Sequence, residues 1–340
     1  MATTNERILV TATGGPSVLG LVSEAMPQPG PGEVRLRVLT AGVAFADILV
    51  REGIYPGVRV PVTPGYDVIA EVEATGPGVS EPAVGSRVAA LIVTGAYARH
   101  VCVPADLCVP VPADTDPVAG VALVLNYLTA WQMLTRCAHV VEGDTILVHG
   151  AAGGVGTALL ELARLRGLRA FGTASAGKHG RIRDLGAEAI DYRREDFVAR
   201  VNAAGGAHAV FDHVGGRHLG RSFAATRPAG TTVVYGFYAG TKGGRADRFA
   251  MLKEVLLGPR FDTVRLLMTS KGATGYTVTA WRDQRRGLYR ADLGALFGLL
   301  ADGSIAPVIA QVLPLREAAR AHELLGGAQV EGKIVLDCTA

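Results

Sequence analysis

The sequence predicts an α/β protein in which a small β-rich domain precedes a domain built on a doubly wound parallel sheet. Two observations carry this prediction. Up to about residue 115, strand-like segments alternate with turns rich in Pro and Gly. After Pro117, short apolar strands and amphipathic helices alternate for roughly 120 residues, and repeated βαβ units of this length form parallel sheets.

Length, composition and charge narrow the class of protein. The 340 residues exceed one ordinary core, and 49% of them are hydrophobic, which excludes intrinsic disorder. A net charge of +3 with dispersed arginines gives no support for nucleic-acid binding, including a secondary RNA-binding role, and four scattered cysteines exclude a disulfide framework. The N-terminus lacks a signal-peptide core, and the longest apolar run, Val118–Trp131, falls short of the ~20 residues that span a bilayer. We therefore expect a soluble, cytoplasmic protein without membrane contact.

The individual elements follow from hydrophobic periodicity. In the first domain, Val34–Val38 alternates strictly as a strand, and a helix runs from Ala46-Asp47 to Gly53, with Asp47 as its cap and not as an acid catalyst. A helical period covers Val118–Ala138. Strands are then predicted at Thr145–Ala151, Leu168–Ala174, Glu188–Tyr192, Ala207–Val214 and Thr231–Phe237, and helices at Gly156–Leu165, His179–Leu185, Glu195–Ala204 and Arg217–Thr226. The chain ends with a helix at Asp292–Ala301, a strand containing Pro314, a helix at Glu317–Leu325 and a strand at Lys333–Asp337.

A glycine-rich turn, Gly150-Ala151-Ala152-Gly153-Gly154-Val155-Gly156, joins the strand and the helix that open this series. Without a Cβ at Gly153 and Gly154 the backbone can approach a pyrophosphate, and Gly156 lets the helix pack closely on the strand. Ala151 stands where the usual fingerprint has its first glycine. Ordinary tight turns share such a pattern, but its place between a predicted strand and a predicted helix favours dinucleotide binding.

The end of the second strand favours NADPH over NADH. An NAD site places an acidic residue about 20 residues after the glycines, where it accepts from the ribose 2′-hydroxyl. Here Phe171–Arg181 contains no acid, while Ser175 offers a hydroxyl and Lys178 a positive charge, which suits a 2′-phosphate. The alternative is a solvated basic turn without a ligand.

Taken together, several segments resemble the medium-chain dehydrogenase/reductase superfamily, and within it the zinc-free quinone oxidoreductase (zeta-crystallin-like) branch. The resemblance covers nearly the whole chain in the right order. Two of the segments are closest in look to the vesicle amine transport protein group, namely Leu125–Ala130 and Ala174–His179. The others are Ala41–Asp47, Arg51–Pro56, Val148–Gly156, Gly172–Ser175 and Ile190–Tyr192.

The resemblance implies a GroES-like catalytic domain over residues 1–118 and a Rossmann NADPH-binding domain over 119–260. Residues 261–340 then return in part to the first domain. It also implies an active cleft between the two domains and a homodimer. The substrate would be a small quinone or an α,β-unsaturated carbonyl (enone/enoyl) compound.

The positions that hold zinc in related enzymes lack ligands here. The resemblance aligns a zinc-binding Cys with Ala44 and a zinc-binding His with Tyr66, and no four-cysteine lobe follows Ala90. Cys102 and Cys108 lack ligand spacing and are interpreted as buried small hydrophobes. The histidines at 149, 179, 208, 213 and 218 show no ligand spacing either and are interpreted as structural. We predict no metal.

Ala44 is also the main departure from the quinone reductases, which usually carry Asn there, near the nicotinamide. The loss of that Asn puts the standard quinone specificity in doubt and opens space for a bulkier or differently placed acceptor. Tyr55 matches the tyrosine that serves enoyl reductases of the superfamily, so it is either the proton donor to the acceptor or a residue that packs on the cofactor. Tyr127 and Thr129 resemble cofactor contacts, with core packing as the alternative.

The predicted function is hydride transfer from NADPH to a quinone or enone, because conjugation delocalises the charge that a hydride delivers. The rival hypothesis is a non-catalytic NADPH-binding protein of the crystallin or vesicle-protein type. Tyr55 is the predicted catalytic residue. The predicted cofactor contacts are Tyr127, Thr129, Ala152, Gly153, Gly154, Val155, Gly156, Thr173, Ser175, Lys178, Tyr192, Gly215, Tyr235, Gly236 and Phe237.

Overall fold

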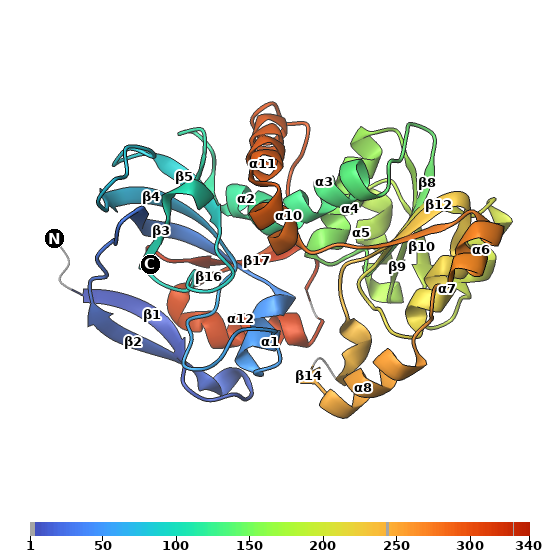
Figure 1. Cartoon of the computed structure of the whole chain (residues 1–340), viewed down its shortest axis with the longest axis horizontal. Coiled ribbons are helices and arrows are strands. Elements are labelled where there is room, and N and C mark those ends of the chain that lie inside the picture. The colour runs from blue at the N-terminus through green and yellow to red at the C-terminus, as the bar shows by residue number, and fades with distance from the viewer. Residues whose placement is uncertain (1–3, 243–244, 329) are drawn as a thin grey trace. The chain divides into compact units, whose positions relative to one another are not determined.

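The computed structural model, which describes residues 4–242, 245–328 and 330–340, confirms the α/β fold (Figure 1). The chain divides into two units. Unit 1 comprises the chain up to Leu125 together with Gly287–Ala340, and unit 2 comprises Asn126–Arg286. The breaks therefore fall at 125/126 and 286/287, whereas the predicted domain boundaries are 118/119 and 260/261.

Unit 1 is a mainly antiparallel β domain. Its seven-stranded sheet has the order β16-β17-β3-β4-β5-β7, with β6 also paired to β3, and only β16 and β17 run parallel. The C-terminal strand β17 lies beside β3, so the chain returns to its first unit as expected. The bounds are β1 Thr4–Val10, β2 Leu19–Ala25, β3 Glu33–Val43, α1 Phe45–Arg51, β4 Asp67–Thr75, β5 Arg87–Leu91, β6 His100–Pro104, β7 Val109–Pro110, α2 Pro117–Ala122, α11 Arg286–Ala301, β16 Ile309–Pro314, α12 Ala318–Gly326 and β17 Lys333–Asp337.

Unit 2 is the doubly wound domain. Its six-stranded parallel sheet has the order β10-β9-β8-β11-β12-β15, so the strand order reverses between β8 and β11. In Figure 1, α3, α4 and α5 lie on one side of this sheet and α6 and α7 on the other. The bounds are α3 Leu128–Gln132, β8 Thr145–His149, α4 Gly154–Leu165, β9 Arg169–Ala174, α5 His179–Asp184, β10 Glu188–Asp191, α6 Phe197–Ala203, β11 Ala207–Asp212, α7 His218–Ala225, β12 Thr226–Val234, β13 Thr241–Lys242, β14 Arg245–Ala246, α8 Arg248–Leu257, α9 Thr263–Thr269, β15 Gly272–Gly275 and α10 Val278–Gln284.

A continuous helical run extends from Pro117 to Cys137. It begins where expected, because the Asp116 carboxylate accepts hydrogen bonds from the Val118 and Ala119 amides and Pro117 occupies the first turn. The helix is 21 residues long and apolar enough to cross a membrane by composition, so it exceeds the apolar run read from the sequence. Of its most apolar window, 78% is buried within the protein, as in the core helix of a globular domain.

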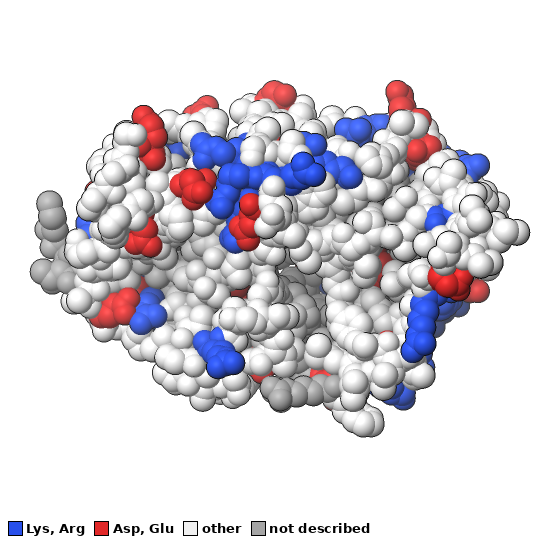
Figure 2. Space-filling view, viewed as in Figure 1, with Lys and Arg blue, Asp and Glu red and all other residues white. Residues whose placement is uncertain are grey.

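The surface carries few charges. Charged residues are 19% of the sequence, and on the face shown in Figure 2 uncharged surface predominates. Among the described residues, the largest group of exposed large hydrophobic side chains belongs to α8 and α9. Eight large hydrophobic side chains of these two helices are more than half exposed, namely Phe249, Leu252, Val255, Leu256, Leu257, Val264, Leu267 and Met268. We call these eight side chains the α8–α9 apolar surface.

Candidate functional site

The glycine-rich turn has the geometry that the sequence predicts. Gly153 ends the turn as the residue before α4, and its amide donates to the Gly150 carbonyl over 2.9 Å. A Cβ on Gly156 would lie 2.4 Å from the Gly150 oxygen, which no side chain could tolerate. The close approach of α4 to the end of β8 therefore requires glycine at position 156.

Ala151, the alanine in place of the first fingerprint glycine, is accommodated from the neighbouring strand. Its side chain is buried, and its amide donates to the carbonyl of Thr173 at the end of β9. A Cβ on Gly172 would lie 2.7 Å from the Ala151 Cβ. The extra methyl group of Ala151 thus occupies space that Gly172 leaves open.

The predicted 2′-phosphate selectors lie on one short turn after β9. Ser175 precedes a single 3₁₀ turn, Ala176–Lys178, and the Lys178 amide donates to the Ser175 carbonyl over 2.9 Å. Both side chains are half-buried. Tyr192 follows β10, is 53% exposed and lies under the guanidinium of Arg193. The C-terminal ends of β9 and β10 therefore bring two cationic side chains and one exposed aromatic ring to the same edge of the sheet.

The turns after β11 and β12 lie against each other. The Tyr235 amide donates to the Asp212 carbonyl, and a Cβ on Gly236 would come within 2.6 Å of the His213 oxygen. Gly215 adopts φ +69°, and a Cβ there would lie 2.8 Å from the Phe237 ring. The structure thus brings together Gly215, Tyr235, Gly236 and Phe237, and their contact with a cofactor stays a prediction.

Tyr127 and Thr129 lie in the core of unit 2. Tyr127 is 2% exposed, and its hydroxyl donates to the Glu161 carboxylate on α4. Burial, together with this carboxylate, raises the pKa of Tyr127 above its usual range. Thr129, two residues further along the helix, is buried as well. The bond to Glu161 favours core packing for Tyr127, the alternative that the sequence leaves open.

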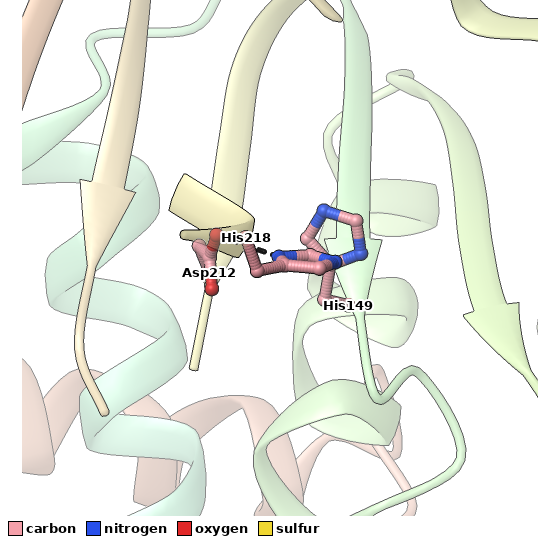
Figure 3. A group of neighbouring side chains, drawn as sticks. All are labelled: His149, Asp212 and His218. Atoms are coloured by element: carbon pink, nitrogen blue, oxygen red, sulfur yellow. Dashed lines mark hydrogen bonds and ion pairs between the residues drawn. The ribbon is translucent and has the colours of Figure 1, made fainter. Parts of the chain in front are cut away.

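A second group of polar residues lies at the ends of β8 and β11 (Figure 3). The sequence indicates its two histidines only as separate structural residues and gives no sign that they meet Asp212. His149 ends β8, Asp212 ends β11, and His218 opens α7. Their metal-ligand atoms lie within 4.8 Å of one another. Their sequence spacing gives no ligand pattern, because the group forms only when two neighbouring strands place their last residues side by side.

Hydrogen bonds already occupy this group. Asp212 accepts from the Val214 and Gly215 amides, from the Ser222 hydroxyl over 2.6 Å and from His218 Nδ1 over 3.1 Å. Although burial opposes it, hydrogen bonds from His218 and Ser222 hold the pKa of Asp212 below its usual range. Asp212 is thus an ionised carboxylate that fixes the turn carrying Gly215.

His149 completes the network. Its Nδ1 lies 3.0 Å from the Thr173 hydroxyl and its Nε2 lies 3.1 Å from the Ser222 hydroxyl. Burial lowers the pKa of His149 to about 3, so the ring is neutral at physiological pH. The histidine therefore links the end of β9 to α7 as a structural residue, and the absence of a metal from the working protein stays a prediction.

In unit 1, Tyr55 follows α1 in a tight turn. Gly53 adopts φ +71°, and the Tyr55 amide donates to the Leu49 carbonyl over 3.2 Å. The half-buried Tyr55 is hydrogen-bonded through its hydroxyl to the hydroxyl of Tyr66. The sequence indicates Tyr66 only as a position where a zinc ligand is missing, since nothing in its spacing connects it to Tyr55.

The start of α1 confirms the predicted role of Asp47. Its carboxylate accepts from the Ala44 amide over 2.8 Å and from the Gly65 amide over 2.9 Å. Burial raises the pKa of Asp47 to about 7. Asp47 is therefore a cap that also ties the segment before Tyr66 to α1. Cys108 is buried as predicted, and burial raises the pKa of its thiol to about 12, whereas Cys102 is only half-buried.

Comparisons with known proteins agree with this architecture. The family model for the alcohol dehydrogenase GroES-like domain matches residues 30–113, and the model described as zinc-binding dehydrogenase matches residues 185–336. A quinone oxidoreductase of Pseudomonas aeruginosa is 34% identical over 340 residues, covering 97% of this chain and 99% of that protein. A 2-haloacrylate reductase of a Burkholderia species is 34% identical, covering 95% and 96%. The human synaptic vesicle membrane protein VAT-1 homolog-like is 31% identical, covering 97% and 80%.

Solved structures give the same picture. The quinone oxidoreductase of Escherichia coli in complex with NADPH has a TM-score of 0.86 at 27% identity, covering 98% of this chain and 99% of that chain. A mycobacterial protein in complex with NADPH has a TM-score of 0.84 at 33% identity, with the same coverage. The fold and the NADPH-binding relatives thus converge on one superfamily.

Proposed function

Because this chain belongs to the medium-chain dehydrogenase/reductase superfamily, we propose that it is an NADPH-dependent oxidoreductase that reduces a quinone or an α,β-unsaturated carbonyl compound without a metal. NADPH is its cofactor, as in two related structures. The observation that carries the proposal is the turn before α4, where a Cβ on Gly156 would lie 2.4 Å from the Gly150 oxygen. Such close packing of helix and turn is typical of dinucleotide-binding turns, in which the pyrophosphate lies at the start of the helix. When bound, NADPH supplies the hydride.

The residues of unit 2 would bind and orient the cofactor. Backbone amides at the start of α4 are suited to the pyrophosphate, since the first turn of a helix leaves its amides without partners inside the helix. Ser175 and Lys178 would contact the 2′-phosphate. Asp212 would act indirectly, because it holds the turn that carries Gly215.

The first expected result concerns Lys178. Removing a charge-assisted contact costs ~1.5–3 kcal/mol, so Lys178→Ala should raise the Kd for NADPH roughly 10- to 150-fold and leave the Kd for NADH almost unchanged. Titration of both cofactors by fluorescence measures this. Lys253→Ala, which removes an exposed charge from α8, serves as the matched control. Equal affinity of the native protein for the two cofactors would contradict the assignment.

The acceptor is proposed from chemistry that needs no Lewis acid. A quinone or enone spreads the incoming charge over conjugated atoms, so the protein must supply orientation, exclusion of water and a hydrogen-bond donor. We propose Tyr55 as that donor. Ala44, with a side chain smaller than the family's Asn, is consistent with an acceptor bulkier than a simple quinone.

The test of this function is an acceptor screen. The protein is mixed with NADPH and a panel of quinones and enones, with and without a chelator, and the loss of NADPH absorbance is followed while the metal content of the sample is measured. Turnover of at least one acceptor that survives the chelator, in a protein without stoichiometric zinc, is the expected result. Tight NADPH binding without turnover of any acceptor would instead favour the non-catalytic hypothesis. The similarity to a synaptic vesicle membrane protein, VAT-1 homolog-like, is the reason to test that hypothesis.

We further propose that two copies of the chain associate through the α8–α9 apolar surface. Eight exposed large hydrophobic side chains on two successive helices differ from the single ones that are scattered over an ordinary surface, and such groups often mark an interface. These two helices precede β15, which pairs only with β12 among the described strands and so leaves one edge of the sheet open. Both features suit a second copy of the same chain, because a two-fold interface pairs like with like.

If two copies associate through this surface, charged residues introduced there should separate the dimer into monomers. Leu267 and Met268 are 73% and 78% exposed, so replacing both with Glu should not disturb the core of unit 2 but should place charges in the interface. Light scattering should give a dimer for the native protein and a monomer for the double variant. Val84→Glu, at an exposed position of unit 1, should stay dimeric. A native protein that is monomeric at micromolar concentration would refute the proposal.

A further inference from the structure

Two tyrosines of unit 1 form a phenol pair. The hydroxyl of Tyr55 is hydrogen-bonded to the hydroxyl of Tyr66, and the rings meet edge to face with centroids 6.0 Å apart at 73°. The two differ in exposure, since Tyr66 is only 4% exposed whereas Tyr55 is half-buried. The Tyr66 phenol is therefore the buried member of the pair, and the Tyr55 phenol lies nearer to solvent.

The backbone holds Tyr66 rigidly. Gly65 before it adopts φ +107°, and a Cβ there would lie 2.5 Å from the Ala96 Cβ, so only glycine fits. The Gly65 amide is bound by Asp47, and the Tyr66 carbonyl accepts from the Ile92 amide over 2.7 Å. The position of the Tyr66 phenol is therefore set by anchors on both sides of the residue.

We propose that Tyr66 is a positioning residue for proton transfer by Tyr55. This inference rests on the proposed function, in which the acceptor takes a hydride from NADPH and a proton from Tyr55. In that step the O–H bond of Tyr55 breaks, a new bond to hydrogen forms on the reduced acceptor, and the electron pair stays on Tyr55 Oη. The Tyr66 hydroxyl donates its hydrogen bond to that oxygen, stabilises the phenolate, and directs the Tyr55 proton away from Tyr66. Solvent then restores the proton.

Geometry favours this direction of donation. A phenol can both donate and accept, so the half-buried Tyr55 can give its proton forward only if it accepts from the buried Tyr66. A hydrogen bond to an ionised oxygen is about twice as strong as one between neutral groups. The pair therefore gains strength during the reaction, which is the property of a group that lowers a barrier rather than one that only packs.

The experiment is a double-mutant cycle on one accepted enone. Tyr66→Phe should lower kcat about 10- to 100-fold, the loss expected for one hydrogen bond to a charged oxygen, with KM and the Kd for NADPH unchanged. Tyr55→Phe should lower kcat further, and Tyr55→Phe/Tyr66→Phe should be no slower than Tyr55→Phe alone. Tyr289→Phe, which removes the hydroxyl of another buried tyrosine of unit 1, should leave kcat unchanged.

The outcomes separate this inference from the function beneath it. Full turnover by Tyr55→Phe would refute the donor role of Tyr55 and the pair together. A large loss in Tyr55→Phe with full turnover in Tyr66→Phe would refute only the role of Tyr66, as would additive losses in the double variant. If Tyr66→Phe does not fold, 3-fluorotyrosine at position 66 keeps the shape and makes the phenol a stronger donor. It should then raise kcat in the native background and change nothing in Tyr55→Phe.

Discussion

Tyr55→Phe is expected to lower the turnover of an enone by roughly 10²–10⁴-fold, the range for loss of a general acid, while the Kd for NADPH stays nearly unchanged. The ring is held by a stiff turn, since Gly53 is left-handed, the Tyr55 amide is bound to the Leu49 carbonyl, and Pro56 fixes the next φ. A Cβ on Gly53 would already lie 2.4 Å from a Thr13 methyl group. The phenylalanine variant should therefore keep the ring in place and lose only the proton donor.

Two measurements on the purified variant check this expectation: the Kd for NADPH and the steady-state turnover of one enone and one quinone. A quinone should suffer less, because its reduced oxygens are less basic and solvent can protonate them later. Tyr289→Phe again controls for the loss of a buried hydroxyl. Full enone turnover by Tyr55→Phe would show that Tyr55 only packs and that solvent is the proton source.

The second large effect concerns stability. Lys333 on β17 and Asp67 on β4 form a buried ion pair, with Nζ 2.9 Å from Oδ2 and side chains that are 2% and 0% exposed. The pair packs against Gly42 on β3, where a Cβ would lie within 2.4 Å of both partners. Lys333→Met should lower the free energy of unfolding of unit 1 by about 3–5 kcal/mol, because it leaves a buried carboxylate without its cation.

The pH dependence of that loss has a definite sign. Burial raises the pKa of Asp67 even though Lys333 opposes the rise, and removing Lys333 should raise it further. A carboxyl group whose pKa is higher in the folded state stabilises the fold at low pH and loses that contribution as pH rises. The deficit of Lys333→Met should therefore be larger at pH 8 than at pH 5.5.

Urea unfolding of the native protein and the variant at both pH values measures this deficit. The double variant Asp67→Asn/Lys333→Met, which removes both charges, should recover much of the lost stability, since replacing a whole buried pair is often close to neutral. A cost below 1 kcal/mol for Lys333→Met, or a deficit that grows as pH falls, would contradict the expectation.

Periodicity explains which elements could be predicted. The strands β8 to β11 and the helices between them are regular, apolar on the expected positions and bounded by Gly or Asp, so their existence and order follow from the sequence. The strand β15 could not be predicted, because Gly272-Ala273-Thr274-Gly275 has two glycines and no branched apolar side chain. The helix α8 could not be predicted either, although it is rich in apolar residues. These residues face solvent as well as the protein and show no clear amphipathic period.

In the candidate site, too, features that are local in sequence could be predicted, and features that form only in the folded chain could not. The glycine turn and the segment after β9, which lacks an acid, are each local in sequence. A dinucleotide site and a preference for NADPH could therefore be predicted from them. The Tyr55–Tyr66 bond depends on the path of the loop between α1 and β4, and the network around Asp212 depends on the register of β8 and β11. His149 and Ser222, for example, are 73 residues apart in sequence, yet 3.1 Å separates their polar atoms. No local pattern encodes such a distance.

The contact between Ala151 and Gly172 has a consequence for recognising similar sequences. In this chain alanine replaces the first glycine of the fingerprint at a point where the turn after β8 packs against β9, and the glycine that leaves room for it is Gly172. At this position the fingerprint therefore limits the combined size of two residues, one in the turn and one on the next strand, and does not require glycine at a fixed place. A search that demands glycine at the first position rejects this chain, whereas a search that scores positions 151 and 172 jointly accepts it.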